Sequence, residues 1–128
     1  MAKVLGVGGI FFKSQDPKAL LAWYQRHLGL SSESSDYAAF EPGALPPGAS
    51  TTFCPFKADT TYFAPSQRDY MFNLIVDDLD GALAQVQAGG GQLVGEVESY
   101  GYGRFGRFMD PDGNKIELWE PAGETPLA

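Results

Sequence analysis

A pattern that repeats after 62 residues constrains the fold of this chain more than any other feature. Asp16 and Asp78 each stand before a run of helix-forming residues, and Gly29 and Gly91 follow those runs at the same spacing. Aspartate is a favoured N-cap, and glycine often ends a helix. The repeat predicts two equivalent helices, each within a unit of one strand, the helix and three more strands.

Both predicted helices carry an apolar stripe, as expected of helices that lie on a sheet. The first is predicted over residues 17–28, and its stripe consists of Leu20, Leu21, Tyr24 and Leu28. The second begins after Asp78 and ends at residues 89–91, and its stripe consists of Leu79, Ala82, Leu83 and Val86.

The predicted strands are short apolar or alternating segments bounded by glycine and proline. In the first module, about 4–60, they cover residues 4–12, 36–41 and 50–56. In the second module, about 70–121, they cover residues 70–76, 92–98, 104–109 and 115–119. Neither module has enough sheet to cover its helix and close its edges. The two are therefore expected to form a single domain over residues 1–128, with the modules pairing within the chain or across two chains, and we expect a homodimer.

A tight turn is predicted at residues 110–114, where Asp-Pro-Asp-Gly-Asn supplies a fixed φ, side-chain bonding to the backbone and tolerance of positive φ. After this turn, Glu117 and Trp119 alternate with Ile116 and Leu118. Successive side chains of a strand point to opposite faces. If the aliphatic face packs against a helix, Glu117 points to the opposite face of the sheet, towards any cavity that this face encloses.

The bulk properties exclude several classes of function. A chain of 128 residues with 44% hydrophobic content suits one globular domain. A net charge of −7 without a basic run argues against nucleic acid or a membrane surface as a partner, and is compatible with a cationic ligand. Cys54 is the single cysteine, which excludes a disulfide framework and indicates a reducing compartment. With no leader or membrane-spanning run in the sequence, we expect a cytoplasmic protein.

The duplicated unit and its final segment, DPDGNKIELWEP, resemble the vicinal oxygen chelate superfamily. This superfamily includes glyoxalase I, extradiol dioxygenases and the fosfomycin- and bleomycin-resistance proteins. The resemblance also rests on DPKALLAWY and HLGL within residues 16–30 and on VDDL at residues 76–79, and it covers nearly the whole chain. It implies an α+β fold in which two βαβββ modules form cupped mixed sheets with the helices outside.

In metal-dependent members of the superfamily, a divalent ion is held by residues on the first, fourth, fifth and eighth strands. By this resemblance Glu117 takes the eighth-strand position, whereas the other positions fall on Gly9, near Phe53 and on Met71. His27, the only histidine, belongs to the first predicted helix. A lone carboxylate does not hold a divalent metal well. We therefore expect no metal and no other cofactor, and a divalent metal bound through Glu117 and unidentified ligands is the alternative.

Glu117 is the candidate catalytic residue, either as a general base or as the counter-charge of a cationic ligand. A purely structural carboxylate is the alternative. The candidate ligand-binding residues are Phe11, Lys13, Met71, Asn73, Tyr102, Arg104, Arg107 and Trp119. The two arginines and the tyrosines of residues 99–103 could form a rim for a planar or anionic ligand, or could be exposed strand residues. We expect Cys54 to be a packed, inert thiol.

The resemblance implies a glyoxalase/bleomycin-resistance-like protein that binds or transforms a small organic molecule in the cup of the sheet, without the usual metal site. The alternative is a metal-dependent glyoxalase-like lyase, isomerase or dioxygenase that uses Glu117. A third possibility is a structural or regulatory partner whose cup is filled by its own side chains. The fold alone does not distinguish these, because one fold can host unrelated chemistries.

Overall fold

The computed structural model describes residues 10–31, 34 and 36–123. Its elements are, in order, α1 (Pro17–Leu28), the 3-10 turn η1 (Pro42–Ala44), β1 (Phe72–Ile75), α2 (Leu79–Ala88), β2 (Gln92–Tyr100), β3 (Gly103–Met109) and β4 (Lys115–Pro121). The strands form one mixed sheet in the order β1-β4-β3-β2. β1 runs parallel to β4, and the other neighbours are antiparallel. The chain is therefore α+β, as predicted.

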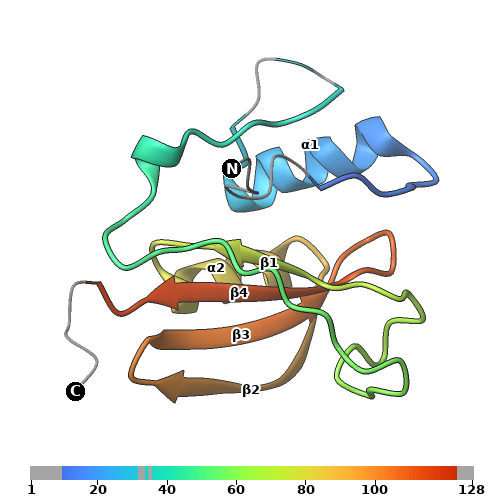
Figure 1. The fold of residues 1–128 in the computed structure, drawn as a ribbon. Helices are drawn as coiled ribbons and strands as arrows, with labels where there is room; N and C mark the ends of the chain where they lie inside the picture. Colours follow the sequence, from blue (N-terminus) through green and yellow to red (C-terminus); the bar gives the residue numbers. More distant parts are fainter. Residues whose placement is uncertain (1–9, 32–33, 35, 124–128) are drawn as a thin grey trace, which may run out of the picture.

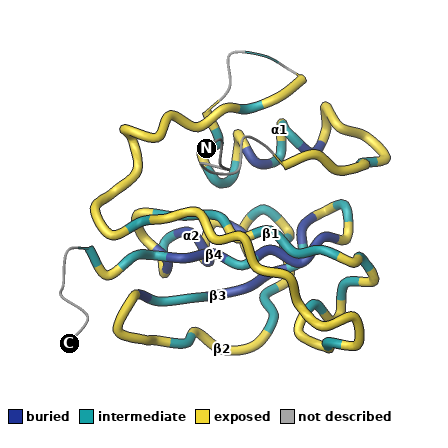
Figure 2. The backbone as a smooth tube through the Cα atoms, in the orientation of Figure 1, coloured by how far each residue is buried: buried dark blue, intermediate teal, exposed yellow. Residues whose placement is uncertain are grey.

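One face of the sheet is covered by α2, which lies behind the strands in Figure 1. The predicted stripe of α2 is buried in full, together with residues of α1, β3 and β4: Leu20, Tyr24, Leu79, Ala82, Leu83, Val86, Phe108, Ile116 and Leu118. Gly106 of β3 allows this close packing, because a Cβ atom there would lie 2.9 Å from Leu83. Figure 2 shows that the buried residues concentrate in α2, β3 and β4, whereas β2 is largely exposed.

The start of α2 is fixed by two carboxylates. The Asp78 side chain accepts a hydrogen bond from the backbone N–H of Gly81 at 3.1 Å, as an N-cap residue does. The Glu120 carboxylate, at the end of β4, accepts from the backbone N–H of Leu79 at 2.9 Å. The helix is thereby attached to the strand that carries Glu117.

The first helix forms with the predicted bounds and packs against the second. The Asp16 side chain accepts from the N–H of Ala19 at 3.1 Å, and Gly29 ends the helix with a φ of 63°. From the middle of α1 the Trp23 indole N–H donates to the carbonyl of Gly89, the C-cap of α2, at 3.0 Å. Tyr24 is buried as predicted, whereas Trp23 is only half-buried.

The turn between β3 and β4 is organised by the Asp110 carboxylate, which is buried. One of its oxygens accepts from the backbone N–H groups of Asp112 at 2.9 Å and Asn114 at 2.8 Å. The other accepts from the Asn114 side-chain amide at 2.8 Å and from the Tyr24 hydroxyl at 2.9 Å. The predicted turn is thus present, and it is also the point where α1 is fastened to the sheet.

The first module does not form the predicted strands within the described residues. Residues 36–41 and 50–56 contain no strand, and residues 36–69 contain η1 as their single helical turn. Prolines at 42, 46, 47 and 55 remove backbone donors from this region, which disfavours regular pairing. Residues 10–12 are not a strand either, and residues 4–9 lie outside the described residues. In Figure 1 the green segment after η1 instead crosses the sheet on the side opposite α2.

No helix in the described part of the chain is both long enough and apolar enough to cross a membrane.

The hydroxyl of Tyr24 is predicted to contribute to stability through Asp110. Burial, followed by the charge of Asp110, raises the pKa of Tyr24 far above its ordinary value, so the hydroxyl stays protonated and donates a hydrogen bond to the carboxylate throughout the neutral range. Tyr24→Phe removes a hydrogen bond to a charged group and should lower the free energy of unfolding by about 1.5–3 kcal/mol. Urea denaturation measures this. Tyr102→Phe, at a half-exposed tyrosine, is the control, and equal losses in the two variants would contradict the assignment.

Candidate functional site

The candidate site lies on the face of the sheet opposite α2, and the strand alternation decides which residues reach it. On β4, Ile116 and Leu118 are buried in the core beneath α2, so Glu117 points to the open side. Glu117 pairs with Arg107 of β3 and with Asn73 of β1, which brings the two side chains beside it.

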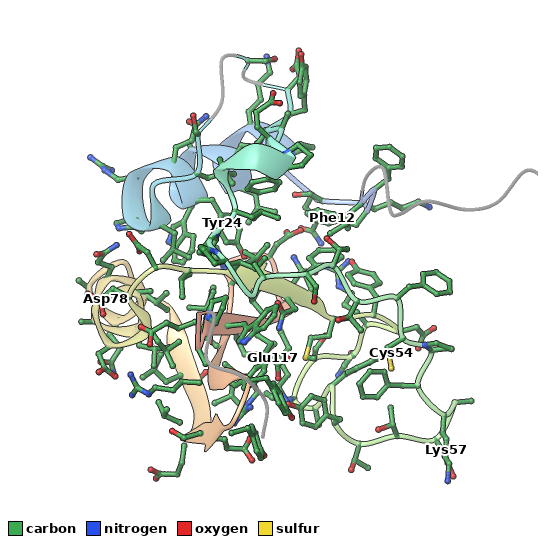
Figure 3. All side chains as sticks on the ribbon, turned by 60° about the vertical axis from the view of Figure 1, so that its left-hand side comes forward. Phe12, Tyr24, Cys54, Lys57, Asp78 and Glu117 are labelled. Atoms are coloured by element: carbon green, nitrogen blue, oxygen red, sulfur yellow. The ribbon has the colours of Figure 1, made fainter. Side chains whose placement is uncertain are left out.

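The Glu117 carboxylate is surrounded by hydrogen-bond donors rather than by apolar side chains. The Asn73 amide donates to one oxygen at 3.0 Å, and the Tyr62 hydroxyl donates to the other at 2.5 Å. The Arg107 guanidinium lies 3.6 Å from that second oxygen. Figure 3 shows Glu117 within the body of the molecule, and its side chain is 14% exposed.

Arg107 lies between two glutamates and is 7% exposed. Its Nη2 is 2.7 Å from a carboxylate oxygen of Glu98 and donates to the Glu96 carbonyl at 2.8 Å. Its Nη1 faces Glu117 and donates to the Tyr62 hydroxyl at 3.3 Å. The guanidinium therefore serves as an internal counter-ion that bridges β2 and β4, with little of it open to an incoming anion.

Tyr62 reaches this centre from the coil between η1 and β1. Burial, and next the hydrogen bond to Glu117, raises the pKa of Tyr62 to about 12, so at neutral pH it acts as a donor. The Lys115 ammonium group donates to the Tyr62 carbonyl and lies 4.7 Å from the centre of its ring. Burial, with the charge of Arg107 adding to it, lowers the pKa of Lys115. Two basic side chains thus hold Tyr62 over β4.

A pocket of about 280 Å³ opens beside this polar centre. Its lining is Phe56, Tyr62, Glu98, Tyr100, Tyr102, Phe105, Arg107 and Glu117. The rings of Phe56 and Tyr62 are stacked with centroids 5.9 Å apart, and those of Tyr100 and Tyr102 are stacked at 5.4 Å. The arrangement offers aromatic surfaces around carboxylate groups, which suits an organic ligand of modest size.

The structure brings some of the predicted residues together and leaves others apart. Glu117 and Arg107 share the polar centre with Asn73, and Tyr102 lines the pocket. Phe11 is 95% exposed and Lys13 is also exposed, and neither lines this pocket. The neighbouring Phe12 packs instead, with its ring centroid 4.6 Å from that of Phe72. Met71 lies on a separate hollow formed mainly by residues 54–71.

Arg104 faces the opposite side of the sheet from Arg107, which corrects the prediction of one cationic rim. Its guanidinium pairs with Asp80 of α2 at 2.9 Å and lies 3.9 Å from Glu120. The two arginines stand three positions apart along β3, and an odd offset places side chains on opposite faces of a strand.

Trp119 does not line the pocket but packs beside Phe105, which does. It is buried, its ring is stacked against Phe105 with centroids 6.0 Å apart, and its indole N–H donates to the Tyr102 carbonyl at 3.1 Å. These contacts hold the 100–105 hairpin in place.

Tyr100, predicted only as part of a possible rim, also lines the pocket, and four lining residues were not predicted in any role at the site: Phe56, Tyr62, Glu98 and Phe105. Phe105 could have been found, because it stands two residues before Arg107 and so shares its face. Glu98 required the register of β2, which shifts irregularly between Val94 and Glu98. Phe56 and Tyr62 lie in a segment whose sequence has no strand or helix period, and no sequence signal places them.

The residues around Glu117 do not fit a divalent metal. Within the described residues, no group of three or more His, Cys, Asp or Glu side chains could hold one. Both oxygens of Glu117 already accept hydrogen bonds, and its nearest charged neighbour is a cation. Gly9, one of the positions implied by the resemblance, lies outside the described residues. Cys54 is exposed rather than packed, and Figure 3 shows it near Lys57 on the outer coil.

The chain has the fold of the glyoxalase-like class. A family model described as a glyoxalase-like domain matches residues 9–119, so the chain belongs to that family. This match confirms the predicted resemblance to the vicinal oxygen chelate superfamily. Among curated proteins, none matches the chain.

Several solved structures are similar to parts or most of this chain. A protein of unknown function from Agrobacterium tumefaciens is 22% identical over 91% of this chain and 98% of its own, with a TM-score of 0.53, and this likeness shows the fold alone. TnmS3, an antibiotic binding protein from Streptomyces, is 34% identical over 42% of this chain and 45% of its own, with a TM-score of 0.37. A glyoxalase/bleomycin resistance protein/dioxygenase superfamily member from Sphaerobacter thermophilus is 32% identical over 38% and 40%, with a TM-score of 0.35. The chain spans less than half the length of the last two.

The two arginines of β3 are predicted to differ in their effect on stability. Arg107→Met leaves Glu98 and Glu117 without their shared cation and should cost about 3 kcal/mol, because a partly buried carboxylate loses its partner. Arg104→Met removes a solvent-exposed ion pair and should cost clearly less. Urea denaturation of both variants makes the comparison. A larger loss for Arg104→Met would contradict the assigned faces of the strand.

Proposed function

We propose that this chain binds a small organic molecule in the pocket on the open face of its sheet, without a divalent metal. The observation that carries the proposal is the pocket of about 280 Å³, which joins exposed aromatic rings to the carboxylates of Glu98 and Glu117. Pockets with aromatic walls and a few placed polar groups are typical of small-molecule sites.

The polar centre is suited to hold a ligand in one orientation. Tyr62, Asn73 and Arg107 fix the Glu117 carboxylate on strands that belong to the core, so a ligand meets a prearranged acceptor. In this proposal Glu117 accepts a hydrogen bond from a polar group of the ligand, whereas the sequence analysis considered it as a general base or as the counter-charge of a cationic ligand.

A metal-dependent lyase, isomerase or dioxygenase is the competing function. The donor set around Glu117 argues against it, because a metal there would have to displace hydrogen bonds from Tyr62 and Asn73 and lie near the Arg107 cation. No observation on the described residues favours that function over binding.

A matched pair of phenylalanines tests whether ligands use this pocket. Phe56 lines it and is 46% exposed, whereas Phe53, three residues away in the same segment, is 86% exposed and does not line it. Small polar aromatic compounds are screened by ligand-observed NMR. Compounds that bind the wild-type chain should bind Phe53→Ala equally and bind Phe56→Ala about tenfold more weakly, because a stacked aromatic wall is lost. Equal binding to both variants, or no compound that binds, would contradict the proposal.

Elemental analysis tests the absence of a metal. Chain purified without chelator and then offered nickel, cobalt, zinc, manganese or iron should retain none in proportion to protein, and ligand binding should be the same with and without EDTA. Stoichiometric uptake that disappears in Glu117→Ala would overturn the metal-free proposal in favour of the metal-dependent one.

We also propose that the chain acts as a cytoplasmic homodimer. The single cysteine supports a reducing compartment. The sheet of the described residues has free edges at β1 and β2, and a second copy could cover one of them. A sedimentation mass near the 13.8 kDa of one chain would contradict the dimer.

A further inference from the structure

The charged side chains that line this pocket are not all available to a ligand. Arg107 is nearly buried, and its contacts are to Glu98, Glu117, Tyr62 and the Glu96 carbonyl. The Lys115 ammonium is held by the Tyr62 carbonyl and by the face of the Tyr62 ring. Both cations near the pocket are therefore committed to neighbouring protein groups.

The carboxylate of Glu98 is the charged group of the lining that remains open to solvent. Its side chain is 43% exposed, against 7% for Arg107 and 14% for Glu117. The Tyr100 hydroxyl donates to it at 2.8 Å. That hydrogen bond, and next the charge of Arg107, lowers the pKa of Glu98, so the group is an anion at neutral pH.

Aromatic faces surround this anion. Tyr100 and Tyr102 are each about half exposed and stacked on one another, and Phe105 meets both rings edge-on at 5.9 and 5.7 Å. Phe56 and Tyr62 supply a second stacked pair in the same lining. The faces of aromatic rings attract cations, and rings beside a carboxylate suit an alkylated ammonium group, which is large and weakly hydrated.

We propose that Glu98, with the rings of Tyr100 and Tyr102, forms a subsite for an organic cation, so that the ligand of this pocket carries a quaternary or alkylated ammonium group. This inference rests on the proposed function, and it adds the chemical class of the ligand. It also assigns Glu98, rather than Arg107, as the residue that selects the charge of the ligand.

Choline and its neutral carbon isostere, 3,3-dimethylbutan-1-ol, test the charge directly, because they share shape and differ in one atom. Both are titrated against the ¹⁵N-labelled full chain by NMR, with benzoate as an anionic probe. Choline should shift the amide resonances of residues 98–105 at concentrations about tenfold lower than the isostere does, and benzoate should bind no better than the isostere.

The variant Glu98→Gln should weaken choline binding about tenfold and leave binding of the isostere unchanged. Glu96→Gln removes the same charge from the same strand at a residue outside the pocket lining, and should have little effect. Thermal unfolding of both variants checks that they remain folded. This pattern would show that choline binding depends on the Glu98 carboxylate itself and not on the net negative charge of the chain.

The outcomes distinguish this inference from the proposed function. If the isostere or benzoate binds in a Phe56-dependent manner and choline binds no better, the cation subsite is overturned while the organic-ligand pocket stands. If choline is the best of the three but Glu96→Gln and Glu98→Gln weaken it equally, the assigned subsite is overturned as well. If none of the three probes shifts residues 98–105, the inference fails irrespective of hits from the wider screen.

Discussion

The hydrogen bonds accepted by Asp110 determine which side chains reach the site. They fix the turn between β3 and β4, and this turn sets the register that pairs Arg107 with Glu117. A slip of one residue would turn every side chain of β4 to the other face, so Glu117 would point towards α2 and Leu118 towards solvent. Through Tyr24 the same carboxylate attaches α1 to the turn. The register of the site and the packing of the first helix thus depend on one buried group.

The second module was predictable because its signals are local and agree with one another. Asp78 caps α2, the apolar stripe of this helix follows the helical period, and glycines 89–91 end it. The turn at 110–114 and the alternation around Glu117 then fix both the hairpin and the face of its carboxylate. The first helix was predictable for the same reason. Alternation places Asn73 and Arg107 on the face of Glu117, and both lie beside it. The same count along β3 places Arg104 on the opposite face, where it pairs with Asp80.

The rest of the site depends on tertiary contacts that leave no period in the sequence. Residues 36–69 are rich in proline and glycine, and their place over the sheet is set by a few side chains rather than by a ladder of backbone hydrogen bonds. Tyr62 is held by Glu117 and by Lys115, which lie more than fifty positions further along the chain. The 62-residue repeat predicted strands where the coil lies. It gave no indication that an aromatic side chain of this coil would contact Glu117.

The charged residues of the pocket lie on strands, whereas Phe56 and Tyr62 of its lining lie on the coil between η1 and β1. Glu98, Arg107 and Glu117 lie on neighbouring strands, so their mutual distances are fixed by the sheet. Tyr62 and Phe56 lie on a segment without regular pairing, where substitutions and changes of length disturb fewer backbone hydrogen bonds. The charge pattern can therefore persist while the part of the aromatic wall formed by Phe56 and Tyr62 changes. In such an arrangement the strands determine which charge is accepted, and the coil determines which shape fits beside it.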